Sequence, residues 1–259
     1  MTRARTGDRK PKGAKITRPR GPVDCFEPFR ENELEGRPCF GGLDLSIVSD
    51  CSALALIFPW GTTDKPIQAD GPPGSAPVQL DEIYRLVMRF WLPEETAKLL
   101  RDRVPYEHWA DQGWLTLTDG NEVDFPRIVD EIGELASKFA IQEIRYDRAY
   151  AAQVMQEVEA IHGVRRAEFP QTMMQFTLPS KLFERAIGKR LIRHQGNPLM
   201  TWQIGNCKVK SDHNGNIRPV RPQKGDFRTV DGVVAAIMAL SGAIDRPRDS
   251  GWDGTIQYL

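Results

Sequence analysis

The stretch Phe40-Gly41-Gly42-Leu43-Asp44-Leu45-Ser46 carries the strongest fold signal of the chain. Its apolar residues predict a β-strand, yet Asp44 stands between two leucines. A carboxylate inside an apolar strand is costly unless it is paired or binds a metal ion. Asp44 is therefore either part of a site or an acid that faces solvent from a half-exposed strand.

Two further strands are predicted after this one, over residues 53–58 and 83–91. Residues 64–77 are rich in proline and glycine and predict a loop. Short links between the three strands favour an antiparallel meander, and regular structure is expected to begin at Phe40.

The second half of the chain alternates between strand and helix patterns. Pro93-Glu94-Glu95 has the residues of a helix start, and Gly163 is a helix stop. The apolar residues Val154, Met155, Val158 and Ile161 are expected on the inner face of the helix before that glycine. The predicted elements are a small strand pair within 104–125, a helix over 127–139, a strand over 141–146, a helix ending at 163, a strand over 164–169, a helix over 179–194, a hairpin within 201–224 that turns at Asn214-Gly215, and a buried helix over 231–240. This order predicts an α/β fold, with a mixed central β-sheet flanked by helices and an added β-hairpin.

Composition bounds the class of protein. The chain has 259 residues, with 35 basic and 35 acidic side chains and a net charge of zero. A nucleic-acid binder is often basic, so this balance argues mildly against tight DNA binding by the free chain. No apolar run is long enough for a membrane span, and the four cysteines match no zinc spacing. We expect a basic disordered arm or linker over residues 1–36, one domain over 37–245, and a polar tail over 246–259.

Two more acids stand at the ends of apolar elements. Asp147 closes the predicted strand 141–146, and Asp231 opens the predicted buried helix. Each has an ordinary explanation, because Asp147 can pair with Arg145 or Arg148, and Asp231 can cap its helix. For each of the three acids taken alone, the ordinary explanation is favoured.

These motifs resemble one known family. The resemblance is to the RNase H-like nuclease domain of phage terminase large subunits, and it covers about residues 37 to 243. It rests on Gly42-Leu43-Asp44-Leu45-Ser46, Ile144-Arg145-Tyr146-Asp147-Arg148, His194-Gln195-Gly196-Asn197-Pro198 with Trp202 and Asn206, and Asp231-Gly232-Val233-Val234-Ala235. It implies that Asp44, Asp147 and Asp231 are the catalytic residues and ligate two divalent ions, Mg²⁺ or Mn²⁺, with Asp44 bridging them.

Other residues have less specific signals. The basic side chains of the predicted hairpin can contact DNA phosphates, although a solvated hairpin explains them almost as well. They are Lys208, Lys210, Arg218, Arg221 and Lys224. Asp50 is either a further metal ligand or the cap of a turn, and the cap is favoured. Asp226 is interpreted as a loop residue, and the role of Arg228 is open.

The resemblance also implies partners and a place of action. The substrate would be double-stranded DNA, cut from viral concatemers during genome packaging in the host cytoplasm. No Gly-x-x-x-x-Gly-Lys-Ser/Thr phosphate loop is present in the sequence. A separate ATPase motor, a small terminase and a portal are therefore expected as partners, and the chain is either a separate subunit or part of a longer protein.

Two alternatives stay open at this point. Another RNase H-like enzyme, such as a junction resolvase or a transposase core, would share the three acids. A non-catalytic DNA- or protein-binding module of the same fold would suit the zero net charge.

Overall fold

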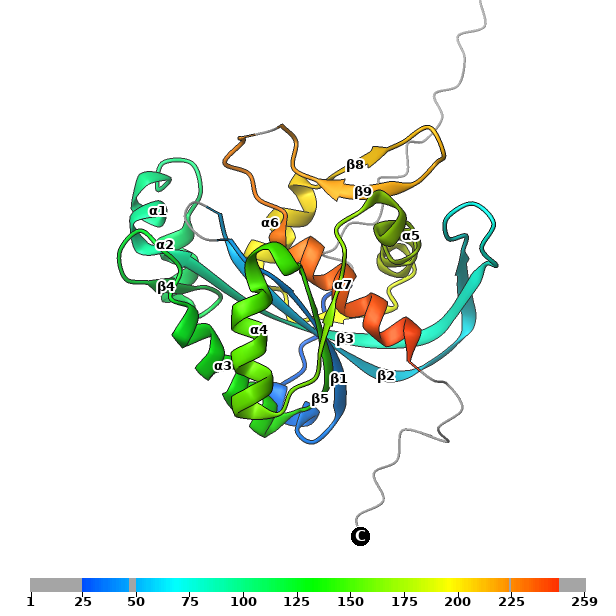
Figure 1. Ribbon diagram of the computed structural model, residues 1–259, viewed down its shortest axis with the longest axis horizontal. Coiled ribbons are helices and arrows are strands. Elements are labelled where there is room, and N and C mark those ends of the chain that lie inside the picture. Colours follow the sequence, from blue (N-terminus) through cyan, green and yellow to red (C-terminus); the bar gives the residue numbers. More distant parts are fainter. Residues whose placement is uncertain (1–24, 47–49, 224, 247–259) are drawn as a thin grey trace, which may run out of the picture.

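The structure is a computed structural model that describes residues 25–46, 50–223 and 225–246. Within these ranges a central β-sheet has helices on both faces (Figure 1). The strands of the sheet are β1 (Pro38–Asp44), β2 (Ser52–Ala69), β3 (Val78–Pro93), β4 (Thr116–Thr118), β5 (Ala140–Tyr146), β6 (Arg166–Glu168) and β7 (Ile192–His194). Their order is β4-β3-β2-β1-β5-β6, with β7 also paired to β3.

The sheet is mixed, as predicted. β1 to β3 form the antiparallel meander, whereas β5 and β6 continue the sheet in parallel from β1. β8 (Lys208–Ser211) and β9 (Ile217–Val220) form a separate hairpin. In Figure 1 this hairpin lies at the top of the molecule, above α5 and α7. The remaining elements are the 3-10 helix η2 (Glu31–Leu34), α1 (Glu94–Leu99), α2 (Tyr106–Asp111), α3 (Phe125–Lys138), α4 (Arg148–His162), α5 (Met173–Gly188), α6 (Pro198–Asn206) and α7 (Asp231–Asp245).

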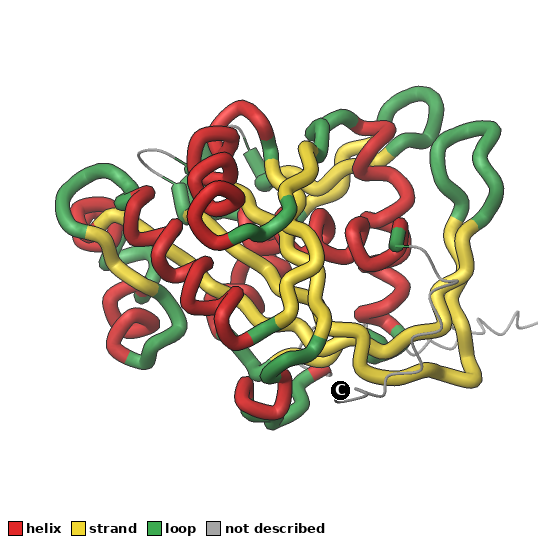
Figure 2. Tube along the Cα trace, turned by 60° about the horizontal axis from the view of Figure 1, so that its bottom comes forward, coloured by secondary structure: helices red, strands yellow, loops and turns green. Residues whose placement is uncertain are grey.

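The central strand β2 shows how the two faces are built. Successive side chains of a strand point to opposite faces. Leu54 and Leu56 join one apolar cluster, which includes the inner faces of α3 and α4. Ala53 and Ala55 join the other cluster, which includes α7. Figure 2 shows the strands running between these two groups of helices. The small side chains on the second face let the apolar helix α7 pack directly on the sheet. This packing fixes the position of Asp231, the first residue of α7.

The meander, the helix after Asp147 and the buried C-terminal helix are confirmed. Gly163 ends α4 in a left-handed conformation, with φ of 68°, and Gly215 has the positive φ of the hairpin turn. All fourteen residues from Asp231 to Ile244 in α7 are buried. No helix in the described ranges has the length and apolar composition to cross a membrane.

The predicted loop over 64–77 is wrong in its first part, because β2 continues to Ala69. Ile67 is opposite Leu80 of β3, and both side chains are buried. Pro66 falls where the register shifts between Thr62 and Ile67, a position that needs no ladder hydrogen bond from it.

The predicted strand pair within 104–125 is also wrong. Residues 106–111 form helix α2, and only 116–118 are a strand, which pairs in parallel with β3. The side chains of Tyr106 and Trp109 are one helical turn apart and pack on each other and on Trp202 of α6. This tertiary aromatic cluster explains why a helix replaces the expected strand.

The helix predicted over 179–194 begins earlier and ends earlier. The Thr172 hydroxyl accepts a hydrogen bond from the Gln175 amide and caps α5, so Pro179 lies inside it. Arg190 takes a left-handed conformation with φ of 60°, and the chain then reverses into β7. The hairpin predicted over 201–224 is confined to 208–220, because Asn197 caps helix α6 with two hydrogen bonds to its side-chain oxygen.

Two predictions about exposure need correction. Residues 25–36 do not belong to a disordered arm, since Cys25, Phe29 and Leu34 are buried against the domain. Ile161 does not face inward and is 66% exposed. The rest of the predicted arm, residues 1–24, and the tail after Arg246 lie outside the described residues.

Candidate metal and DNA site

Asp44 and Asp147 are brought together by the sheet. β1 and β5 are parallel neighbours, and Leu43 pairs with Tyr146. Asp44 ends β1, and Asp147 directly follows β5 and caps α4 by accepting a hydrogen bond from the Ala149 amide. Because carboxyl ends of parallel strands meet at one edge of a sheet, the two carboxylates face the same space.

Asp231 reaches that space because α7 lies against β1. A side chain at Gly42 would be impossible, since a Cβ there would be 2.0 Å from the Ala235 carbonyl oxygen and 2.9 Å from the Met238 side chain. The glycine two residues before Asp44 therefore allows the backbone of α7 to approach β1. Asp231, the first residue of α7, then lies beside the end of the strand.

The three acids line one open cleft of about 820 Å³. All three residues predicted to be catalytic contribute to its wall, although they come from two strand ends and a helix start. Further lining residues are Asp50, Tyr150, Gln171, Lys210, Arg218 and Arg221. The cleft thus has an acidic floor and a basic side formed by the β8–β9 hairpin.

The carboxylates of the cleft are held in an unfavourable environment. Burial, and then the negative charges of Asp231 and Asp147, raise the pKa of Asp44 well above its ordinary value. Burial, and then the Asp50 carboxylate, raise the pKa of Asp231 to about 7. Both shifts therefore reflect, first, the burial of the carboxylates and, second, the like charge beside them.

Hydrogen bonding satisfies this cluster only in part. Gln171 Nε2 donates to Asp44 Oδ1 at 3.3 Å. Asp231 Oδ2 is buried and has no hydrogen-bond partner within the described ranges. An unpartnered buried carboxylate oxygen is rare unless a cation or water completes it. The oxygen donors suit a hard divalent ion such as Mg²⁺ or Mn²⁺.

The geometry is that of an open cleft and not of a closed cage. In the part of the chain that the structure describes, no three His, Cys, Asp or Glu side chains have the spacing of a finished metal site. Mg²⁺ usually keeps several waters and binds through one or two carboxylates. The donor set therefore fits water-rich coordination by Asp44, Asp147 and Asp231.

Asp50 is an ion-pair partner of Arg221, because its two oxygens accept hydrogen bonds from that side chain at 3.2 and 2.7 Å. The turn that Asp50 was predicted to cap includes residues 47–49, which lie outside the described residues. Arg228 similarly pairs with Asp226 in the loop before α7. The Asp50–Arg221 pair is not recognisable from sequence spacing, because its two residues are 171 residues apart, whereas Asp226 and Arg228 are only two residues apart.

The predicted basic residues divide into three groups. Lys210, Arg218 and Arg221 line the cleft, whereas Lys208 is exposed on β8 and is not part of the cleft wall. Lys224 lies outside the described residues. Arg218 Nη1 also donates to the Gln171 carbonyl at 3.1 Å, which ties the hairpin to the segment that contacts Asp44.

Two cleft residues, Gln171 and Tyr150, were missed from the sequence. Gln171 follows β6, the next parallel strand beyond β5, so the same edge rule that unites Asp44 and Asp147 would have found it. Tyr150 is in the first turn of α4, just after Asp147, and its side chain is exposed.

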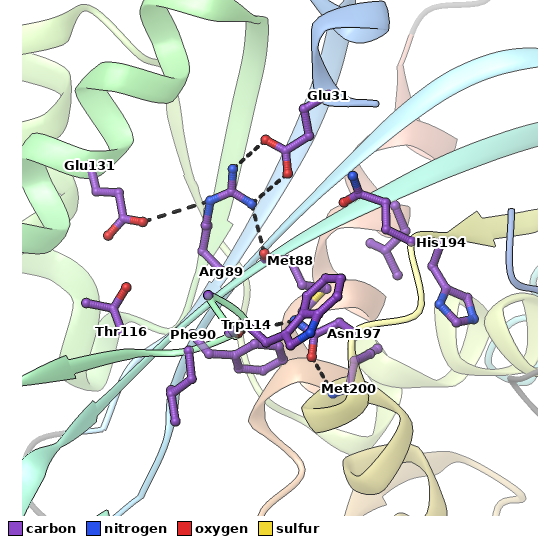
Figure 3. Close-up of a pocket in the computed structure, with 14 residues that line it drawn as sticks. Glu31, Met88, Arg89, Phe90, Trp114, Thr116, Glu131, His194, Asn197 and Met200 are labelled. Atoms are coloured by element: carbon purple, nitrogen blue, oxygen red, sulfur yellow. Dashed lines mark hydrogen bonds and ion pairs between the residues drawn. The ribbon is translucent and has the colours of Figure 1, made fainter. Parts of the chain in front are cut away.

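A second pocket of about 330 Å³ lies elsewhere and has a different character. Figure 3 shows Arg89 between Glu31 and Glu131, with Trp114 and His194 also in its wall. Arg89 pairs with Glu31 at 2.5 Å and with Glu131 at 3.9 Å. Each of its two glutamates pairs with Arg89, so in this pocket, unlike the acid cleft, every carboxylate has a basic partner.

Several known proteins are similar to this chain. Residues 81–246 match the family described as "Terminase large subunit, endonuclease domain". The chain is 27% identical over 220 residues to the terminase large subunit of Enterobacteria phage HK97, covering 84% of this chain and 40% of that protein. It is 28% identical over 221 residues to "Protein YmfN" of Escherichia coli K12, covering 82% of this chain and 44% of the relative.

The fold comparison gives the same result. The crystal structure of the HK97 bacteriophage large terminase superimposes with a TM-score of 0.65 and 25% identity, covering 83% of this chain and 43% of that one. The predicted RNase H-like fold is thereby confirmed. The chain spans less than half the length of the relatives that it matches.

Proposed function

The chain belongs to the family of terminase large subunit endonuclease domains, and from this premise we propose that it is a metal-dependent endonuclease that hydrolyses DNA phosphodiester bonds with two divalent ions. The observation that carries the proposal is the meeting of Asp44, Asp147 and Asp231 in one cleft beside a basic hairpin. Its biological role would be to cut viral concatemeric DNA during packaging, in the host cytoplasm.

Each side of the cleft has a part in this chemistry. Asp44, Asp147 and Asp231 would hold Mg²⁺ or Mn²⁺ ions, with Asp44 between the other two. Bound divalent ions supply Lewis acidity, which activates water and neutralises charge on the leaving oxygen. Gln171 would orient Asp44 through its hydrogen bond. Lys210 and Arg218 would bind the phosphate backbone without selecting a sequence.

Partners follow from the family and are part of the proposal. Double-stranded DNA would be the substrate. An ATPase motor, a small terminase and a portal would bring the DNA to the cleft, which suits a chain with zero net charge and modest affinity of its own.

Cleavage of a supercoiled plasmid tests the proposal. Purified chain is incubated with Mn²⁺, Mg²⁺ or EDTA, beside Asp44→Asn and the control Asp111→Asn, which changes an exposed acid on α2. We expect metal-dependent nicking by the wild type and the control but not by Asp44→Asn.

The same cleavage assay can also give results that would favour the two alternative functions. An intact plasmid with every metal would favour the non-catalytic binding module. A strong preference for branched over linear duplex DNA would favour a junction resolvase.

A further inference from the structure

The start of α7 has an unusual cap. The first turn of a helix leaves backbone N–H groups without partners inside the helix. The N-cap residue of α7 is Val230, which provides no side-chain hydrogen bond. The Gly232 amide instead donates to the side-chain oxygen of Gln203, a residue of α6, at 2.6 Å. A side chain from another helix thus performs the capping role next to Asp231.

The other end of the same side-chain amide reaches Thr229. Gln203 Nε2 donates to Thr229 Oγ1 at 2.7 Å. A hydroxyl that accepts one hydrogen bond keeps its own hydrogen free to donate. The Thr229 side chain in turn hydrogen-bonds to Asp231. Gln203, Thr229 and Asp231 therefore form one chain of polar contacts.

This chain of contacts has no free space around it. Gln203 and Thr229 are 0% and 2% exposed. A Cβ at Gly232 would be 2.7 Å from Gln203 Oε1 and equally close to the Phe90 ring. Side chains fixed by packing and hydrogen bonds hold a neighbouring ligand in one orientation. One carboxylate oxygen of Asp231, Oδ2, has no protein hydrogen-bond partner among the described residues.

We propose that Gln203 and Thr229 are positioning residues, which orient the Asp231 carboxylate so that Oδ2 points to a divalent ion in the cleft. The inference rests on the proposed function, because it needs a metal ion at Asp231. It assigns a role to helix α6, whose sequence resembles the family but which contributes no residue to the wall of the acid cleft.

A matched pair of variants at Thr229 tests the inference. Thr229→Val keeps the shape but removes the hydroxyl, and Thr229→Ser keeps the hydroxyl. Mn²⁺ binding is measured by electron paramagnetic resonance of free Mn²⁺, and folding by thermal unfolding in EDTA. Loss of a group that orients a metal ligand weakens metal affinity about 10–100-fold. We expect that loss for Thr229→Val and near wild-type affinity for Thr229→Ser.

Gln203→Met provides an independent second test, since methionine fills a similar volume without either hydrogen bond. We expect weaker Mn²⁺ binding here too, together with a lower unfolding temperature, because the Gly232 amide loses its cap. Cleavage by Thr229→Val should recover toward the wild-type rate when Mn²⁺ is raised, which separates a loss of affinity from a loss of catalysis.

The outcomes separate this inference from the proposed function. If the wild type binds Mn²⁺ and Thr229→Val binds it equally well, the inference is overturned while the nuclease proposal stands. Equal losses of affinity in Thr229→Val and Thr229→Ser would also overturn it, since the hydroxyl would not matter. If the wild type binds no Mn²⁺, the nuclease proposal fails and the inference fails with it.

Discussion

Two acidic regions of this molecule differ in whether their carboxylates have basic partners. In the N-terminal clasp, defined as residues 25–34, Glu27 pairs with Arg85 at 2.9 Å and with Arg193 at 3.0 Å. Glu31 of the same segment pairs with Arg89 at 2.5 Å. In the acid cleft, Asp44 and Asp231 face other carboxylates, and Arg221, whose charge acts on both, is already paired with Asp50.

The difference separates structure from function. Arg85 is buried over the Trp60 ring, 3.5 Å from its centroid, and its partners neutralise it. Such an ion-pair network can hold a segment to the domain without any ligand. The cleft gathers more carboxylates than basic side chains, and perturbed acids of this kind gather at functional sites. Acidic residues alone do not indicate a site, whereas acids without partners do.

The largest expected effect concerns Asp231. Asp231→Asn should slow metal-dependent plasmid cleavage by roughly 1000-fold, equivalent to about 4 kcal/mol of transition-state stabilisation. The same change should raise the unfolding temperature in EDTA, because it removes a buried charge without a partner. Cleavage kinetics and thermal unfolding on one preparation check both. A variant that is both inactive and less stable would mean that Asp231 is structural.

A substitution in the N-terminal clasp should have the reverse effect, with lower stability and unchanged cleavage. Arg85→Met should lower the free energy of unfolding by about 2 kcal/mol, because it leaves Glu27 without its buried partner. Breaking a fully buried ion pair costs roughly 3–5 kcal/mol of unfolding free energy. The expected loss is smaller here because the Glu27 side chain is 29% exposed. Urea unfolding measures the loss. The rate of DNA cleavage per folded molecule should stay unchanged. The control is Lys98→Met, which breaks the exposed Lys98–Glu94 ion pair of α1 and should change neither the stability nor the cleavage rate.

Opposite pH dependences should distinguish the two regions. The pKa of Asp231 is raised from 3.8 to about 7 in the metal-free fold. Between these values the unfolded chain has lost the proton that the folded state retains, so stability should fall as pH rises. The pKa of Glu33 in the clasp is lowered, first by the Arg30 amide and then by Arg85. That contribution is present above the ordinary pKa of Glu33 and is lost on acidification.

Thermal unfolding in EDTA between about pH 5 and about pH 8 checks the acid-cleft part of this prediction. The wild type should lose stability across this range, and Asp231→Asn should lose less. If both curves have the same slope, Asp231 is not the group responsible. Saturating Mn²⁺ should reverse the wild-type trend, because metal binding requires the ionised acid.

The smallest effect should come from the basic side of the cleft. Lys210→Gln removes an exposed charge of β8 and should weaken duplex binding only a few-fold. The slope of log affinity against log salt should fall by about one for each DNA phosphate that the protein no longer neutralises. Fluorescence anisotropy at several salt concentrations measures it. Lys208→Gln, on the same strand but outside the cleft wall, is the matched control and should leave the slope unchanged.

Local patterns in the sequence determined much of the fold. The apolar runs around Asp44 and before Asp147 set two strands, and the small apolar residues after Asp231 set a buried helix. These are signals from neighbouring residues, where alternation and helical periodicity act directly. The three acids could be named for the same reason, since each interrupts or ends an apolar element.

Long-range contacts decided the rest. The cluster of Tyr106, Trp109 and Trp202 turned an expected strand into α2, and the Asp50–Arg221 pair joined residues that no spacing rule connects. The cap by Thr172 moved the start of α5 away from its predicted position, and the cap by Asn197 begins a helix, α6, where no helix was predicted. The role of Gln203 at the start of α7 likewise became visible only in three dimensions. Sequence patterns report which face of an element is buried, whereas only the tertiary structure decides which partner covers it.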